Sequence, residues 1–423
     1  MGGRDQDRRH QGGVMYSLHL SPEQLQIRDT VRDFVAQEIR PLALAPQRLE
    51  ASARPILVEA LDKASQIGLR TLALSEEAGG AGADNLTCCI VTEELAAGDP
   101  DLAAVLAQTS TLAHVLLDGL MTQEQRSRFL PAFLADHRHH LALAEHEAHR
   151  DTALGINYHR PQPNEAPFAT VAVRSGDAWI INGRKDRVIG ASQAALFIVR
   201  ATLGENGAGT LLVPRDTLGL TVMPSEANER WHHGACGALV LQDCRVPAEN
   251  CLAADAALFA HAGRGIPQDA ALNLGIGRAA YEAALDYAQL RVQGGRPIIE
   301  HQAIGAKLAE IAVRLEVARA AIWQAAWASD HPDAVAERSL PDLPLTTIAG
   351  VFAAEAIYRA VKDAAECFGA MGVMRDMPLQ KYVHDARVCL HSGAGASEAK
   401  LRIAEALARY RRPATPAAVL AAE

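Results

Sequence analysis

Hydrophobic positions in the first third of the chain recur with the spacing of helices that bury one face. Val31, Phe34, Val35 and Ile39 fall on one side of a helix. The residues before them, 21–24, read Ser-Pro-Glu-Gln, which is a helix start with a capping box. Similar patterns span 57–69, 86–97, 102–120 and 123–134. This part of the chain is therefore predicted to be mainly α-helical.

The pattern changes near residue 141. Short apolar runs separated by Gly, Asp, Asn and Pro predict β-strands at 141–144, 169–173, 178–182, 195–201, 209–213 and 238–241. Long amphipathic patterns then predict helices at 274–292, 301–329, 345–368 and 396–410, which would pack as a bundle. We therefore predict an α+β protein with five segments: a disordered tail (1–14), an N-terminal α-helical domain (15–140), a middle β domain (141–255), a C-terminal four-helix bundle (256–412) and a second tail (413–423).

Composition narrows the choice of partners and compartment. The net charge of -9 argues against nucleic acid as a partner. We find no apolar run long enough to cross a bilayer, and the Arg- and Gly-rich N-terminus does not resemble a secretory signal. The seven cysteines show no metal-ligand spacing, which favours reduced thiols. We therefore expect a cytoplasmic protein that binds neither membrane nor nucleic acid.

The most specific motif lies between residues 366 and 398. It contains a glycine pair, then Arg-Asp-x-Pro-x-x-Lys at 375–381, then Asp-Ala-Arg at 385–387. This closely resembles the C-terminal signature of the acyl-CoA dehydrogenase family. Segments at 75–82, 175–185 and 291–304 resemble other motifs of that family in the same order, so the resemblance extends over roughly residues 20–412. It implies the family's three-domain fold, an FAD cofactor, a substrate that is an acyl thioester of coenzyme A or of an acyl-carrier protein, and a homodimer or homotetramer.

The resemblance also locates the family's catalytic carboxylate, which this chain lacks. In the loop after residue 391 its position falls on Gly393 or on Ala394, depending on the end from which one counts. A second position used within the family falls on Gly265. Asp269 and Glu398 are the candidate substitutes. The alternative is that both are solvated charges at helix ends.

Several positions that the resemblance assigns to the flavin are altered as well. The family's threonine, two residues after Ala142, is Ala144, and its tryptophan and second threonine are Arg187 and Ile189. The aromatic residue that packs on the adenosine is Gly294, and the glutamine near the pyrophosphate is Glu366, a carboxylate that would repel it. Four family positions are retained, and helix packing explains them equally well: Arg291, Gln302, Gly369 and Gly372. We expect weak or absent FAD binding.

A cluster of histidines offers an alternative chemistry. His137, His139, His140, His146 and His149 fall within a short span, and a further pair follows at 232–233. The spacing of His146 and His149 is one residue short of the helical His-Glu-x-x-His zinc motif. A polar rim between the first two domains is the other interpretation, and we expect no metal site.

Three functions are consistent with these residues. The first is a divergent acyl-CoA dehydrogenase-family enzyme that acts on an acyl thioester, for which standard α,β-dehydrogenation is in doubt. The second is a flavin-dependent monooxygenase-type relative, which needs no base for the α-proton. The third is a flavin-free, non-catalytic family member, or a hetero-oligomeric partner of an intact paralogue. Flavin occupancy separates the third from the others, and oxygen consumption with reduced flavin separates the second from the first.

Overall fold

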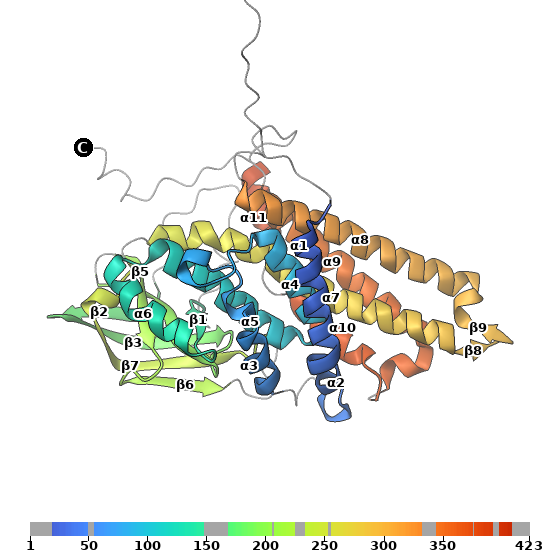
Figure 1. The fold of residues 1–423 in the computed structure, drawn as a ribbon, viewed down its shortest axis with the longest axis horizontal. Helices are drawn as coiled ribbons and strands as arrows, with labels where there is room; N and C mark the ends of the chain where they lie inside the picture. Colours follow the sequence, from blue (N-terminus) through green and yellow to red (C-terminus); the bar gives the residue numbers. More distant parts are fainter. Residues whose placement is uncertain are drawn as a thin grey trace, which may run out of the picture.

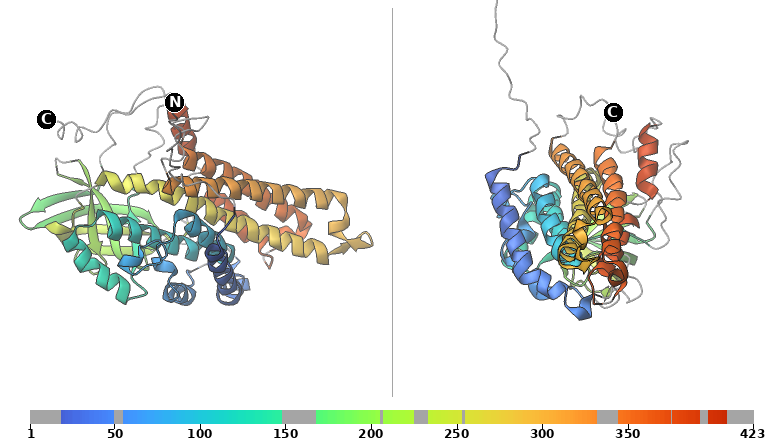
Figure 2. Two further views of the ribbon diagram at one scale, coloured as in Figure 1. Left: turned by 45° about the horizontal axis from the view of Figure 1, so that its top comes forward. Right: turned by 90° about the vertical axis from the view of Figure 1, so that its right-hand side faces the viewer.

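The structure is a computed structural model. It describes residues 19–49, 55–147, 168–204, 207–224, 233–252, 255–331, 344–374, 376–391 and 397–407. Both tails and the loop with Gly393 and Ala394 lie outside these residues. Helices from the first third of the chain lie between a β-sheet and a set of long C-terminal helices (Figures 1 and 2). The α+β class and the three-part architecture are confirmed.

The first third is helical, as predicted. Its helices are α1 (Pro22–Phe34), α2 (Arg40–Ala43), α3 (Val58–Gln66), α4 (Asn85–Gly98), α5 (Pro100–Ala113) and α6 (Gln123–Ala135). The capping box is present: the Gln24 amide donates to Ser21 Oγ at 3.1 Å, and the Ser21 amide donates to Gln24 Oε1 at 3.0 Å. Residues Pro100–Leu120 are long and apolar enough to cross a membrane by composition, but 67% of the apolar window is buried, as expected for a core helix.

The middle of the chain forms a seven-stranded sheet. Its strands are β1 (His140–Ala144), β2 (Val171–Ser175), β3 (Ala178–Val188), β4 (Ala194–Leu203), β5 (Ala208–Pro214), β6 (Leu220–Pro224) and β7 (Gly237–Pro247). The order is β1-β4-β2-β3-β7-β6, with β5 also paired to β4. β6 was not predicted, because it is a short edge strand whose side chains are partly exposed.

The C-terminal helices are α7 (Asp255–Leu290), α8 (Gln302–Asp330), α9 (Leu345–Cys367), α10 (Leu379–His391) and α11 (Ser397–Leu407), with the hairpin β8 (Val292–Gln293) and β9 (Arg296–Pro297) after α7. The predicted fourth helix of the bundle, 396–410, corresponds to α11, but α10 packs against both α7 and α9. The sequence pattern missed α10 because Lys381 and Asp385, which are buried and paired at 2.9 Å, interrupt its apolar face.

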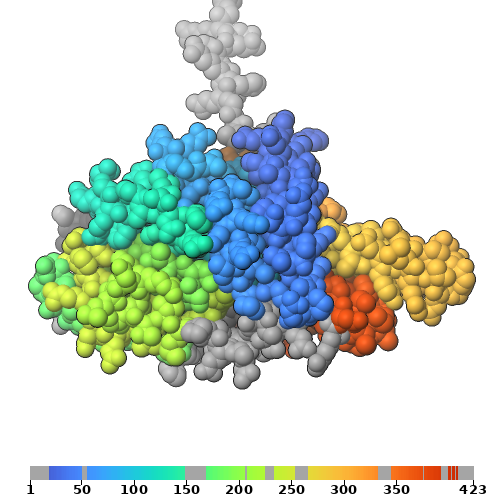
Figure 3. Space-filling view, turned by 60° about the horizontal axis from the view of Figure 1, so that its bottom comes forward, coloured from blue at the N-terminus to red at the C-terminus, as the bar shows by residue number. Residues whose placement is uncertain are grey.

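Helix α7 begins well before the predicted residue 274 and continues through Pro267. It joins the N-terminal helices to the bundle, because α4 packs along it and α8. The carboxylates of Glu93 and Glu94 on α4 are buried and bind Arg278 of α7 at 3.2 and 2.7 Å. Arg319 of α8 binds Glu93 at 2.8 Å. Figure 3 shows the N-terminal segment (blue) between the part of the chain that forms the sheet (green) and the C-terminal part (orange), which projects to one side.

Candidate functional site

The ends of β1 and β3 bring together four of the residues assigned to the flavin. Ala142 and Ala144 of β1 are fully buried. The Asp186 amide, near the end of β3, donates to the His146 carbonyl just after β1 at 2.9 Å. Arg187 has a left-handed backbone with φ 53, and its Nε donates to His146 Nδ1 at 3.0 Å. The guanidinium of Arg187 is therefore held by His146.

Ile189 lies beside these residues and is packed against neighbouring chain segments. A Cβ on Gly234 would come within 2.4 Å of Ile189 Cγ2 and 3.2 Å of Ala104 Cβ on α5, so only glycine fits there. The Ile189 carbonyl accepts a hydrogen bond from Gln108 Nε2 at 3.0 Å. The position therefore presents a tightly packed apolar side chain where the family carries a hydroxyl.

Buried charges fix the chain after β1. Lys185 is fully buried, and its Nζ lies 2.7 Å from Glu147 Oε1. Glu147 also accepts hydrogen bonds from the amides of Ala169 at 2.8 Å and Thr170 at 2.9 Å. Burial alone would raise the pKa of Glu147, but the bonds from Lys185 and Thr170 outweigh burial and lower it to about 2. Glu147 is therefore ionised, and its role here is structural.

The retained flavin positions lie at the opposite end of the molecule. Arg291 follows α7, next to the β8–β9 hairpin, and Gln302 begins α8, far from β1 and β3 (Figure 1). One chain therefore does not bring the two groups of residues together.

Glu366 and the two glycines at this end are accounted for by local structure. Glu366 is exposed and ion-paired with Lys307, whose hydrogen bond lowers the pKa of Glu366. The repulsion expected at a pyrophosphate is therefore opposed by a neighbouring cation. Gly369 has φ 56 directly after α9, and a Cβ on Gly372 would lie 2.4 Å from the Ala365 carbonyl oxygen. Helix termination alone requires both glycines.

The candidate positions for a base lie along α7 and beyond α10. Gly265 is half-buried within α7, and among the described residues no heavy atom would lie within 4 Å of a Cβ there. Asp269 follows about one helical turn later. Its side chain is accessible to solvent, but the protein around it partly desolvates the carboxylate and raises its pKa to about 6. The interpretation of Asp269 as a helix-end charge is wrong, because α7 begins at Asp255. Glu398 is in α11, but its side chain lies outside the described part of the structure.

Comparison with known proteins identifies the family. Residues 21–137 match the model "Acyl-CoA dehydrogenase, N-terminal domain", and residues 267–408 match "Acyl-CoA dehydrogenase, C-terminal domain". The chain belongs to the acyl-CoA dehydrogenase family. It is 30% identical to the probable acyl-CoA dehydrogenase YngJ of Bacillus subtilis, over 90% of this chain and 97% of that protein.

Solved structures of the acyl-CoA dehydrogenase fold superpose along nearly the whole chain. Butyryl-CoA dehydrogenase from Megasphaera elsdenii matches with a TM-score of 0.79 and 24% identity, over 93% of this chain and 100% of that one. The prolyl acyl carrier protein oxidase AnaB matches with a TM-score of 0.77 and 23% identity, over 92% and 100% of the two chains. At these identities the likeness shows the fold alone.

Members of the acyl-CoA dehydrogenase family are FAD-dependent flavoproteins. The residues of this chain fit FAD poorly. Ile189 and Ala144 offer no hydroxyl to a flavin ring, and Arg187 is held by His146. Gly294 has φ +63, a backbone conformation that side chains rarely adopt, and it offers no aromatic ring to an adenosine. No chemical step is therefore assigned to the flavin.

The histidines of the sequence cluster have separate roles in the part of the chain that is described. His137 contacts Gln66 at 3.3 Å, and His140 is buried beside Thr109. Burial lowers the pKa of His140 to about 4, and also that of His146 to about 4. His149 and His232 are outside the described residues. In the same part of the chain, no three His, Cys, Asp or Glu side chains form a group that could hold a metal ion.

Two residues were not assigned to the site by the sequence analysis: His233, which was counted there only among the histidines, and Asn273. His233 Nδ1 lies 3.3 Å from Asp101 of α5, and its Nε2 lies 3.1 Å from the Asp385 carbonyl oxygen of α10, so it links the sheet to helices from both other regions. Asn273 is a buried amide within α7. Neither feature has a signal in the sequence: the partners of His233 are distant in the chain, and a lone polar residue in an apolar helical pattern does not reveal whether its side chain has a partner.

Proposed function

We propose that this protein is a divergent acyl-CoA dehydrogenase-family member that binds an acyl thioester of coenzyme A or of an acyl-carrier protein, and that it does not carry out standard α,β-dehydrogenation. The observation that carries the proposal is the lack of a carboxylate at the family's base positions, Gly265 in α7 and Gly393 or Ala394 in the loop. A positioned base contributes roughly 10²–10⁴-fold to the rate of proton transfer. Without it, dehydrogenation at the family's usual rate is not expected unless Asp269 or Glu398 substitutes.

The proposal extends to the cofactor and the assembly. FAD binds weakly or not at all, because each lost hydrogen bond costs about 0.5–1.5 kcal/mol and several are lost together. Residues near Ala144 and residues near Arg291 lie at opposite ends of one chain, so a cofactor that contacts both requires a second copy (Figure 1). A homodimer or homotetramer in the cytoplasm is therefore part of the proposal.

Two other functions each follow from a particular feature. A flavin-dependent monooxygenase-type reaction is favoured by the missing base, which that reaction does not need. A flavin-free role, alone or in a hetero-oligomer with an intact paralogue, is favoured by the packing of Ile189 and by the Arg187–His146 contact. Oxygen uptake with reduced flavin would support the monooxygenase-type reaction. Purification of the protein without flavin would support the flavin-free role.

The test has two measurements on the full-length protein. Gel filtration should yield colourless protein, and stoichiometric FAD surviving that step would overturn weak binding. A panel of straight and branched acyl-CoA substrates, with added FAD and an artificial electron acceptor, should give no turnover in the family's normal range. Such turnover would overturn the proposal and point to Asp269 or Glu398.

The missing base can be restored in each register. Gly393→Glu and Ala394→Glu should be prepared separately, because the loop position differs by one residue between the two counts. Dehydrogenation gained in one variant would show that the carboxylate was the main defect. No gain in either would show that the altered flavin residues also prevent the reaction.

A further inference from the structure

Asn273 is a buried amide whose hydrogen-bonding capacity is unused. Asn273 is 2% exposed, and neither its Nδ2 nor its Oδ1 has a hydrogen-bond partner in the described part of the chain. Buried side-chain amides nearly always bind a protein group, a water or a ligand. The unused amide of Asn273 therefore indicates a site for a polar molecule.

Asp269 lies one turn before Asn273 on the same face of α7. Side chains in a helix lean toward its N-terminus, so the amide of Asn273 extends over the turn that contains Asp269. Asp269 is exposed, and the described residues give it no ion pair or hydrogen bond. The protein packed around this accessible side chain partly desolvates its carboxylate, which raises its pKa to about 6. The accessible carboxylate of Asp269 and the buried amide of Asn273 thus lie one helical turn apart, and the oxygens of both are free to accept hydrogen bonds.

The neighbouring residues show that this pair does not face α4. Gly275 faces α4, since its Cβ would meet the Glu93 carbonyl at 2.3 Å. At about 100° per residue, Asp269 points about 120° away from Gly275 around the helix. Gln268 next to it is fully engaged: Thr111 Oγ1 donates to its Oε1 at 3.0 Å, and its Nε2 donates to Asn85 Oδ1 at 2.8 Å. The hydrogen-bonding groups without partners therefore lie on the face of α7 that carries Asp269 and Asn273, and not on the face that packs against α4.

We propose that Asp269 and Asn273 bind a protonated amine on the acyl group, so that the substrates are aminoacyl thioesters. This inference rests on the proposed function, because it concerns the acyl part of the thioester. An ammonium group donates several hydrogen bonds, and the carboxylate of Asp269 and Oδ1 of Asn273 can both accept them. A neutral hydroxyl would leave the carboxylate charge uncompensated. Near pH 7 Asp269 is mostly ionised while an aliphatic amine is protonated, so both charges are present.

The test compares ligands that differ only in the charged group. The α-aminobutyryl and α-methylbutyryl amides of aminopantetheine, the pantetheine analogue with an amine in place of the thiol, form one pair, and the β-aminobutyryl and β-methylbutyryl amides form another. The amide linkage replaces the thioester so that the probes do not hydrolyse. Isothermal titration of the full-length protein should show one amine binding roughly tenfold to a hundredfold more tightly than its methyl counterpart, the range expected for a hydrogen bond to a charged group.

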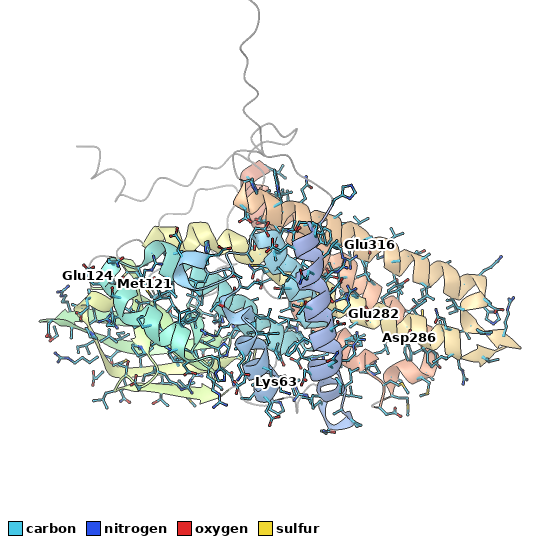
Figure 4. The ribbon with its side chains drawn as sticks, in the orientation of Figure 1. Lys63, Met121, Glu124, Glu282, Asp286 and Glu316 are labelled. Atoms are coloured by element: carbon cyan, nitrogen blue, oxygen red, sulfur yellow. The ribbon has the colours of Figure 1, made fainter. Side chains whose placement is uncertain are left out.

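Variants assign this preference to the two residues. Asp269→Asn should bring the affinities for amine and methyl ligand to within a factor of about two to three, which is within the usual context dependence of a neutral hydrogen bond. Asn273→Leu should reduce the preference while the melting temperature stays the same or rises, since the buried amide is replaced by an apolar group. Asp286→Asn is the matched control: Asp286 is an exposed aspartate nearer the end of α7 (Figure 4), and its variant should keep the wild-type preference.

Failure of this inference can be distinguished from failure of the proposed function. If none of the probes binds, acyl-thioester binding itself is overturned. If all bind without preference for the amine, only the inference about the acyl group is wrong. If Asp269→Asn keeps the preference for the amine, the inference is also wrong. If the wild type turns over acyl-CoA after all and this variant loses the turnover, Asp269 acts on a proton instead.

Discussion

Lys185→Met is expected to lower the free energy of unfolding of the sheet by about 3–5 kcal/mol, the usual cost of removing one partner from a buried ion pair. Lys185 is fully buried and its Nζ lies 2.7 Å from Glu147. It also lies 4.2 Å from the centre of the Phe168 ring. Methionine nearly preserves the volume, so most of the loss comes from leaving the carboxylate of Glu147 buried without its cation. The amides of Ala169 and Thr170 still bind that carboxylate, which favours the lower end of the range.

The same ion pair predicts a pH dependence. Glu147 has a pKa of about 2 in the folded protein, below the ordinary value near 4.5. A group whose pKa is lowered by folding stabilises the protein fully at a pH above its pKa in the unfolded chain. This contribution is lost as the pH falls through its pKa in the folded protein. The wild type should therefore lose this part of its stability between about pH 4.5 and pH 2. In Lys185→Met the carboxylate has lost its main stabilising partner, so this component should shrink.

The assay is urea unfolding, with hydrogen–deuterium exchange of peptides from β3 and β7 to locate the loss. Arg245→Met is the control, because Arg245 in the same sheet pairs with Asp177 at 3.2 Å but both side chains are exposed. Exposed pairs contribute about 0–1 kcal/mol. If Lys185→Met destabilises no more than Arg245→Met, and β3 exchange is unchanged, the reasoning about the buried pair is refuted.

Two further predictions concern helix contacts. Burial alone would lower the pKa of His233, but Cys389 and Asp101 outweigh it and raise the pKa well above its usual value. The stabilising contribution of protonated His233 should therefore be complete below about pH 6.5, and it should be lost as the pH rises through the pKa of His233 in the folded protein. A melting temperature of the wild type that does not change at alkaline pH would contradict this, and so would a pH profile that His233→Gln leaves unaltered. Gly372→Ala should cost about 1–3 kcal/mol through the clash with Ala365, measured by thermal melting, whereas Gly305→Ala on α8 should be neutral or stabilising.

Local features of the chain were predictable from the sequence. The capping box at Ser21, the helices of the first third and most of the strands follow from spacing and from residues that are close in sequence. The family followed from a specific run of residues, and the family models confirm it. The cysteines, expected to be reduced, are free in the described structure. Such signals survive because each depends on neighbours within a few residues.

The tertiary structure decided what the sequence left open. Helix α10 contains a buried ion pair, Lys381–Asp385. In the sequence these two charged residues make the segment look exposed to solvent. The position of Asp269 inside α7, and of Asn273 beside it, depends on a helix that continues past Pro267 because α4, α8 and α9 pack along it. The contact of His233 joins residues more than a hundred positions apart. Burial and long-range pairing give a side chain its pKa and its partners, and neither is encoded in the spacing of nearby residues.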